Sequence, residues 1–483
     1  MREPLTHRTP RRSPRLTRAL PGAVALLCAA AASSVWTTVR AADDIVHEFK
    51  YGSIGTEGTV GVPYWIYKVL PEVFADKLPA RAGRGWEKIG FTYESPTADL
   101  PLGTTMSSDW VPRVGLNCAT CHAGVYREGP GGAPHVVLGM PSHQMDLQAY
   151  ARFLSAAAHD PRFNASTLVA AMKKDPAFGF VNGLVYSWFA VEATKKGILE
   201  RDPRLAWFDS RPPQGPGRVD TFNPYKAMFP AETHFDSDTT VGTADLPSLW
   251  NQRIRDGLWL HWDGNNNSVD ERNKSAAIGA GATPDSINLD ALGRIAAWIQ
   301  DLAPPAYPAA RIDRARADSG RPLYAQHCAR CHDVGQPQVG QTIDLADIGT
   351  DPERVQSFTP ELVAAMNTIG TGKPWKFSHF RKTNGYAGMP LDGVWLRAPY
   401  LHNGSVPTLR ALLLLDPRPS TFYRGYDVYD FTGVGFTAAG AEAASGGVLF
   451  DTAVRGNGNG GHTYGTSLPV AEREAILEYL KTL

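Results

Sequence analysis

The chain has few cysteines and no long apolar run outside its N-terminus. Only five of its 483 residues are cysteines, too few for a fold held together by many disulfides. After residue 42 no stretch reaches about 18 consecutive apolar residues, the length expected of a membrane-spanning helix. Basic and acidic residues balance at 48 each, without a basic cluster after the N-terminus. The sequence therefore predicts neither a nucleic-acid partner nor an integral membrane span in the mature chain.

Residues 1–42 predict a secretory signal peptide. A leader rich in arginine precedes an apolar run over residues 23–35, and Val39-Arg40-Ala41 offers a small-residue cleavage site. The segment holds seven arginines and one glutamate, so its removal leaves a net charge of about −6. We therefore expect a periplasmic or secreted protein.

The four cysteines outside this segment form two Cys-x-x-Cys-His motifs. These are Cys118-Ala119-Thr120-Cys121-His122 and Cys328-Ala329-Arg330-Cys331-His332. Two thiols at this spacing add to the two vinyl groups of a haem, and the histidine that follows binds the iron. The motifs predict two covalently bound haem c groups, with His122 and His332 as proximal ligands. Zinc is disfavoured because it does not explain both histidines. A thioredoxin-like redox motif is also disfavoured, because such a motif is expected once, after a strand, whereas this chain has two Cys-x-x-Cys pairs.

Patterning around the motifs predicts two cytochrome c-like domains. Residues 289–302 and 475–483 each place apolar side chains on one helical stripe, and residues 317–327 form a short helix before the second motif. A Pro/Ala-rich stretch over residues 303–310 then marks a boundary, giving domains at residues 43–303 and 304–483. With 47 Gly and 37 Pro, the fold class is mainly α, with long Gly/Pro-rich loops and few short strands.

Several segments resemble the di-haem cytochrome c peroxidase superfamily. Residues 262–264 (Trp-Asp-Gly) and 398–404 (Ala-Pro-Tyr-Leu-His-Asn-Gly) resemble two of its elements. The resemblance is closer to the branch related to the rubber (polyisoprene) oxygenases, through residues 139–141 (Gly-Met-Pro), 218–224 (Arg-Val-Asp-Thr-Phe-Asn-Pro) and 461–466 (Gly-His-Thr-Tyr-Gly-Thr). It extends from about Tyr51 to the C-terminus.

This resemblance implies a division of labour between the haems. One haem, usually the N-terminal one, has an open distal position that meets peroxide or dioxygen, while the other is six-coordinate and relays electrons. Trp262 would be the electron relay between them. The resemblance also implies a calcium ion between the domains, for which residues 263–267 offer oxygen ligands.

The distal ligand of the second haem is predicted to be His462. It follows a Gly-rich loop over residues 456–461, which allows close approach of the backbone, and it matches a histidine of the related branch. Met389, near a methionine that some peroxidases use, is an alternative. His402, interpreted as stabilising a turn, and His379 are further candidates.

We assign no distal ligand to the first haem. His135 and His143 are interpreted as structural, and His261, next to Trp262, is a candidate for facing the distal pocket. Glu271 is the nearest general acid/base candidate for peroxide cleavage, with a surface charge as the alternative interpretation.

The leading functional hypothesis is an oxidoreductase that reacts with peroxide or dioxygen and exchanges electrons with a periplasmic donor or acceptor. A pure electron-transfer cytochrome is the main alternative. Oxidative processing of a partner protein's side chain is another. A polyisoprene-type oxygenase is a further alternative, weakened because no phenylalanine occurs between Phe235 and Phe358, where rubber oxygenases have one in the distal pocket.

Overall fold

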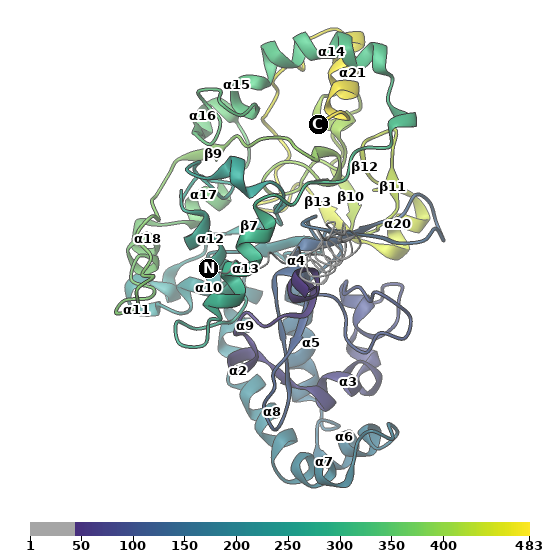
Figure 1. The fold of residues 1–483 in the computed structure, drawn as a ribbon, viewed down its shortest axis with the longest axis vertical. Helices are drawn as coiled ribbons and strands as arrows, with labels where there is room; N and C mark the ends of the chain where they lie inside the picture. The colour runs from purple at the N-terminus through teal and green to yellow at the C-terminus, as the bar shows by residue number, and fades with distance from the viewer. Residues whose placement is uncertain (1–43) are drawn as a thin grey trace, which may run out of the picture. The chain divides into compact units, whose positions relative to one another are not determined.

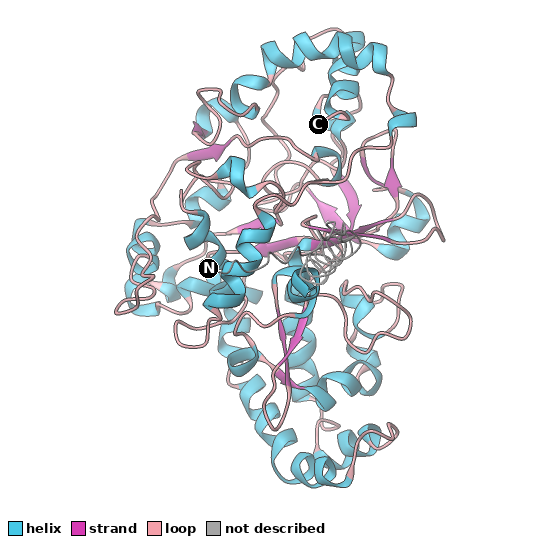
Figure 2. Cartoon of the chain, in the orientation of Figure 1, coloured by secondary structure: helices cyan, strands magenta, loops and turns pink. Residues whose placement is uncertain are grey.

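The computed structural model describes residues 44–483, so the predicted signal peptide lies outside the described residues. The chain divides into residues 1–47 and a compact unit of residues 48–483. Helix accounts for 41% and strand for 11%, which confirms a mainly α fold (Figures 1 and 2). No helix in residues 44–483 has the length and apolarity to cross a membrane. The domain boundary at residues 303/304 stays a prediction.

Short helices alternate with long loops throughout residues 44–483. Those before residue 300 are α2 (Glu57–Val60), α3 (Tyr64–Val73), α4 (Cys118–His122), α5 (Leu147–His159), α6 (Ala165–Met172), α7 (Phe180–Val185), α8 (Val191–Leu199), α9 (Asp202–Asp209), α10 (Asn223–Lys226), α11 (Pro230–Thr233), α12 (Val269–Gly279) and α13 (Leu289–Ile299). The later ones are α14 (Arg314–His327), α15 (Ala329–His332), α16 (Leu345–Ile348), α17 (Glu353–Ser357), α18 (Pro360–Met366), α19 (Leu409–Leu412), α20 (Gly440–Gly446) and α21 (Val470–Leu480).

Single turns of other helix types fill some of the connections. The 3₁₀ turns are η1 (Ala75–Lys77), η2 (Gly85–Ile89), η4 (Phe235–Ser237), η5 (Gln252–Arg255), η6 (Ala309–Arg311) and η7 (Val394–Leu396). A π-helical turn, η3 (Tyr186–Ala190), joins α7 to α8.

The strands form one three-stranded sheet and five antiparallel pairs. The sheet has the order β1-β3-β2, and the pairs are β4-β5, β6-β7, β8-β9, β10-β13 and β11-β12. Their bounds are β1 (Val62–Pro63), β2 (Thr104–Met106), β3 (Arg113–Leu116), β4 (Ala123–Tyr126), β5 (His135–Leu138), β6 (Arg218–Asp220), β7 (Thr243–Asp245), β8 (Thr342–Asp344), β9 (Gly385–Ala387), β10 (Thr421–Arg424), β11 (Tyr429–Asp430), β12 (Gly435–Phe436) and β13 (Val448–Asp451).

The three helices predicted beside the haem motifs are present, with shifted ends. α13 begins after Asn288, whose side chain accepts a hydrogen bond from Ala291 N, as a helix N-cap does. α14 begins three residues earlier than predicted because Asp313 caps it in the same way. α14 packs along α21 (Figure 1), and at Gly320 a Cβ atom would lie only 1.9 Å from the carbonyl oxygen of Ala475. This glycine therefore permits the close helix contact.

Three hydrophobic cores lie among the residues that the structure describes. The first contains only residues between 62 and 199. The second combines Met140 and Trp250 with residues between 302 and 483, and the third combines residues 222–287 with residues 358–380. Trp250 is fully buried, and its indole N–H donates to the carbonyl of Leu138 at 2.9 Å. The first half of the chain thus contributes to the packing around the second haem motif.

Candidate haem sites

The second motif places a histidine in the geometry of an iron ligand. His332 ends α15, and its Nδ1 pairs with the carbonyl oxygen of Met389 at 2.8 Å. A hydrogen bond at Nδ1 fixes the ring orientation and leaves Nε2 to bind the metal. Burial lowers the pKa of His332, so the imidazole is held in the neutral form that binds metals.

His462 lies opposite His332. The centroids of the two rings are 6.1 Å apart. Two metal–imidazole bonds of about 2 Å each, plus about 1 Å from each nitrogen to its ring centre, would separate two axial imidazoles by about 6 Å. Burial, followed by the neighbouring His332, lowers the pKa of His462 to about 4. The pair therefore fits the two axial ligands of one haem.

The loop before His462 explains how its ring reaches this position. His462 has a φ of 47°, and its backbone N–H donates to the carbonyl of Ile348 at 2.8 Å. A Cβ atom at Gly461 would lie 2.3 Å from the carbonyl carbon of Gly349. The glycine before the histidine thus allows the loop to lie directly against α16.

The alternative ligands occupy other positions. The Met389 carbonyl is bound to Nδ1 of His332, so this residue lies on the proximal side of the predicted haem. His402 is buried and stacks on Tyr386, with ring centroids 3.8 Å apart. His379 Nδ1 lies 2.7 Å from a carboxylate oxygen of Glu271. None of the three faces His332 as His462 does.

The first motif forms a short helix with two partly buried cysteines. Asn117 caps α4 through a hydrogen bond from Ala119 N. All four motif cysteines are free thiols rather than disulfides, as haem attachment requires. Burial raises the pKa of Cys118 to about 11 and that of Cys121 to about 12. Both thiols are therefore protonated and lie in apolar surroundings.

His122 differs from His332 in its surroundings. Burial, followed by the nearby Arg272, lowers its pKa to about 3. Its Nδ1 is buried without a hydrogen bond of good geometry, although the backbone of Pro247 is close enough to raise the pKa slightly. Within residues 44–483 no histidine ring is in contact with it in the way that His462 is in contact with His332.

Arg272 is a site residue that the sequence analysis missed. It lies on α12 within electrostatic range of Cys118, His122 and His261. Burial, and then the neighbouring Arg255, lowers the pKa of Arg272 to about 10. No sequence pattern points to Arg272 beyond its position directly after Glu271. The structure thus puts a cation and a candidate distal histidine near the first motif.

His261 is held with one ring nitrogen engaged. Its Nδ1 pairs with the side-chain oxygen of Asn265 at 2.7 Å, and its φ is 64°. Burial lowers its pKa to about 4. The neutral ring is thus fixed at Nδ1, and Arg272 is within electrostatic range of it.

Trp262 connects the surroundings of both motifs. Its indole N–H donates to the carbonyl oxygen of Asp245 at 2.8 Å, two residues before Pro247 near His122. Its own carbonyl accepts from Ala387 N at 2.8 Å, two residues before the Met389 carbonyl that holds His332. Trp262 therefore bridges one segment that reaches the first motif and another that reaches the second.

The Asp245 segment is fixed by buried charges. Its carboxylate is 5% exposed and forms an ion pair with Arg424, while its backbone N–H donates to the carbonyl of His402 at 2.8 Å. Burial raises the pKa of Asp245 to about 6, against the opposing effect of Arg424. This network holds the carbonyl that binds Trp262, and it gives His402 a structural role.

Glu271 is not a surface charge. It is 5% exposed, and its carboxylate accepts hydrogen bonds from Asn266 Nδ2, Ser378 N and His379 N at 2.8–3.1 Å. Burial raises its pKa, but the hydrogen bonds from His379 and Asn266 outweigh burial and hold the pKa below its usual value. The carboxylate is thus an anionic anchor for the loop at residues 378–379. This arrangement does not favour a role as general acid.

Replacing Glu271 with alanine is expected to lower the free energy of unfolding by about 2–3 kcal/mol, because the buried Asn266 amide and the part-buried N–H groups of Ser378 and His379 lose their acceptor. The lowered pKa means that its charge stabilises the fold above the unfolded-state pKa of about 4.5, and that this contribution is lost as pH falls through the folded-state pKa. Urea unfolding at neutral pH and near pH 4 measures both effects. Glu271→Gln, which keeps the shape, should remove most of the pH dependence between the two conditions.

The predicted calcium ligands are engaged with protein groups. The carboxylate of Asp263 is 1% exposed and pairs with Arg354 at 3.2 Å. It also accepts from Asn265 Nδ2 at 3.0 Å. In residues 44–483 no group of three or more His, Cys, Asp or Glu side chains is arranged to hold a metal ion. Calcium therefore stays a sequence-based prediction.

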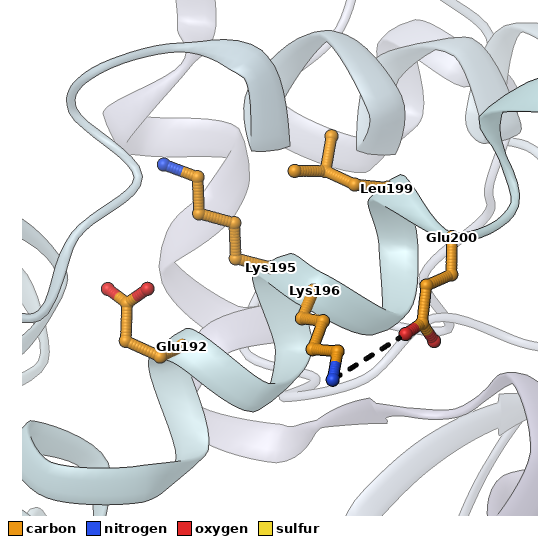
Figure 3. Close-up of a pocket in the computed structure, with 5 residues that line it drawn as sticks. All are labelled: Glu192, Lys195, Lys196, Leu199 and Glu200. Carbon is orange, nitrogen blue, oxygen red and sulfur yellow. Dashed lines mark ion pairs between the residues drawn. The ribbon is translucent and has the colours of Figure 1, made fainter.

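A surface pocket on α8 is separate from the haem motifs. It is lined by Glu192, Lys195, Lys196, Leu199 and Glu200, as Figure 3 shows. All five side chains come from one helix and its C-cap, and none belongs to either motif.

Two parts of the second half match described families. Residues 385–423 match the family "RoxA-like, cytochrome c-like", a span that contains β9, Met389 and His402. Residues 315–374 match "Cytochrome C oxidase, cbb3-type, subunit III", a span that contains the second Cys-x-x-Cys-His motif. Cytochrome c domains bind haem c and transfer electrons.

Two uncharacterised proteins of Sinorhizobium fredii are similar over longer regions. The protein y4iM is 33% identical over 236 residues, which cover 43% of this chain and 52% of y4iM. The chain thus spans about half the length of this relative. The protein y4iJ is 26% identical over 511 residues, which cover 84% of this chain and 82% of y4iJ. Together with the two family matches, these findings confirm the resemblance drawn from the motifs: the chain is similar to the RoxA-like branch of di-haem cytochromes c.

Proposed function

We propose that this chain is a periplasmic di-haem c-type cytochrome oxidoreductase in which the first haem reacts with peroxide or dioxygen and the second transfers electrons. The observation that carries the proposal is the asymmetry of the two motifs. His332 faces His462 across 6.1 Å, whereas His122 faces no comparable ring within the described residues. His332 and His462 would hold the iron of the second haem from both sides, and His122 alone would hold that of the first, which would keep a position for an oxidant.

The residues would hold the cofactors in distinct ways. Cys118 and Cys121 would attach the first haem, with His122 as its proximal ligand. Cys328 and Cys331 would attach the second, between His332 and His462. When bound, the haems supply reversible one-electron chemistry and, where a coordination position is open, a site for an oxygen-containing oxidant.

Arg272 and His261 are suited to polarise an oxidant near the first motif. A guanidinium donates hydrogen bonds without losing its proton, so Arg272 would stabilise negative charge that develops on an oxygen atom. The neutral His261 ring, held at Nδ1 by Asn265, would accept or return a proton at Nε2. These roles are an alternative to Glu271 as the acid/base.

The match to the RoxA-like family over residues 385–423 favours dioxygen over peroxide as the oxidant, because the rubber oxygenases use dioxygen. Polyisoprene, the substrate of the rubber oxygenases, is the candidate substrate in that case and is tested in a separate experiment with dioxygen. The missing distal phenylalanine between Phe235 and Phe358 weakens the case for polyisoprene.

Rapid mixing of the haem-loaded protein with hydrogen peroxide, and of its reduced form with dioxygen, tests the proposal. We expect the absorbance of one haem to change on mixing, and oxidant to be consumed with turnover when an electron donor is present. Polyisoprene latex is added in a separate experiment with dioxygen. If neither oxidant alters either haem beyond slow outer-sphere oxidation, the protein is an electron carrier.

Replacing Trp262 with phenylalanine is expected to slow electron exchange between the haems by roughly tenfold, equivalent to about 1.4 kcal/mol of activation free energy. Phenylalanine is harder to oxidise and cannot donate to the Asp245 carbonyl. Flash photolysis of the half-reduced, carbon monoxide-bound protein measures this rate. Trp259→Phe is the matched control. Trp259 belongs to the same chain segment as Trp262, but its ring lies under the Arg381 guanidinium. An equal rate in both variants would remove Trp262 from the route.

A further inference from the structure

A stripe of large apolar side chains is exposed on the helical segment made by α7 and η3. We call this the apolar stripe. Its members and their exposed fractions are Phe180 (80%), Val181 (61%), Leu184 (47%), Trp188 (74%) and Phe189 (73%). Single exposed apolar residues are common on soluble proteins, but a contiguous group of this size usually marks an interaction surface.

The π-helical turn gathers these side chains on one face. In an α-helix, side chains four residues apart are offset by about 40° around the helix axis. The wider π turn has more residues per turn and therefore reduces this offset. Leu184 follows Phe180 by four residues, and Trp188 follows Leu184 by four across η3. Phe189 follows Val181 by eight and continues a second, adjacent row. The five side chains therefore form one surface rather than a spiral.

The opposite face of the same segment is anchored in the first core. Tyr186 is 1% exposed and Ala190 is 8% exposed. The Tyr186 ring contacts Phe178 at 5.8 Å, and Phe178 contacts Trp65 at 5.2 Å. The segment is thus fully packed on its inner side, and the apolar stripe is a fixed outer surface of a completed core.

Charged residues begin one turn beyond the stripe. On α8 they are Glu192, Lys195, Lys196 and Glu200, seen in Figure 3, with Lys196 and Glu200 paired at 3.8 Å. Their charges balance, so the region has no strong charge of either sign. A protein partner that docks by charge complementarity would find little to recognise here.

The size of the stripe argues against a second copy as its occupant. The five side chains expose roughly 600 Å², taking about 150–250 Å² for a fully exposed aromatic side chain. A stable interface needs about 800 Å² from each partner. Trp, Phe and Leu are instead the side chains that helices lying in the surface of a lipid bilayer bury between the headgroups and the acyl chains.

We propose that the apolar stripe inserts into the surface layer of a phospholipid bilayer, with the charged residues of α8 remaining at the headgroups. The protein would then be held at a membrane without a segment that crosses it. Insertion depends on apolar area, so it should take place on zwitterionic lipid and should persist at high salt. The proposal is independent of the chemistry at the haems.

Flotation of the mature, haem-loaded protein with phosphatidylcholine vesicles tests this. We expect the protein to float with vesicles, and Trp188→Ser/Phe189→Ser to weaken the partition by about tenfold or more. Phe180→Ser/Leu184→Ser should act similarly and covers the case in which the first variant folds poorly. The matched control is Leu449→Ser/Val470→Ser, two apolar residues of 58% and 59% exposure on other elements. The haem absorbance spectrum checks that each variant is intact.

Any one of three results would overturn the proposal: that the wild-type protein fails to float, that the stripe variants float as well as the wild type, or that the control variant loses as much binding as the stripe variants. Gel filtration without lipid tests the other occupant, a second copy of the chain. If the wild type is a dimer and the stripe variants are monomers, a second copy covers the stripe and the proposal is wrong.

Discussion

Replacing Cys118 and Cys121 together with serine is expected to reduce covalently bound haem from two groups per chain to one and to abolish the reaction with peroxide or dioxygen. Serine cannot form the thioether bonds, and the first haem is the one proposed to keep a coordination position for the oxidant. Denaturing gels stained for haem, the pyridine haemochrome assay and intact mass measure the attached haem.

The mirror variant, Cys328→Ser/Cys331→Ser, is the matched control. It should also lose one haem, but the remaining haem should still bind carbon monoxide when reduced. The assignment fails if the first variant retains both haems, or if the reaction with oxidant survives in it and disappears in the mirror variant.

Replacing His462 with glycine is expected to convert the second haem from low spin to high spin and to raise its reduction potential by on the order of 100 mV, since axial ligands tune this potential over a wide range. Glycine adopts the left-handed backbone that His462 has at a φ of 47°, so the loop should keep its course. Visible spectroscopy and a redox titration report the change.

Two comparisons make the His462 result specific. Added imidazole should restore the low-spin spectrum, because it replaces the missing ligand without altering the protein. Met389→Leu should leave the spectrum unchanged, because Met389 contacts His332 through its backbone carbonyl. A low-spin second haem in His462→Gly, together with a high-spin one in Met389→Leu, would make Met389 the ligand.

The sequence was most informative where a pattern is local. The Cys-x-x-Cys-His motifs, the caps at Asn288 and Asp313 and the apolar stripes of α13 and α21 all depend on neighbours within a few residues. These predicted the helices that surround the haem motifs, with errors of a few residues at their ends. The prediction of a mainly α fold follows from the same local signals.

Contacts between distant segments were beyond sequence reasoning. Glu271 reads as a surface charge in a polar helix, and only the fold brings residues 378–379 to it from more than 100 positions away. Arg272 gave no sequence signal because its value as a site residue depends on α12 lying beside the first motif. His462 was predictable only through a glycine-rich loop and a resemblance, since 130 residues separate it from His332.

The measurement that tests the central claim most directly is low-temperature electron paramagnetic resonance of the fully oxidised protein, with its haem content fixed at two per chain. The account predicts one low-spin ferric signal from the haem between His332 and His462, beside one high-spin signal from the haem on His122. Two low-spin ferric signals in the fully oxidised protein, with the haem on His122 still low spin after the second haem is reduced, would contradict it and would leave an electron carrier with no open iron.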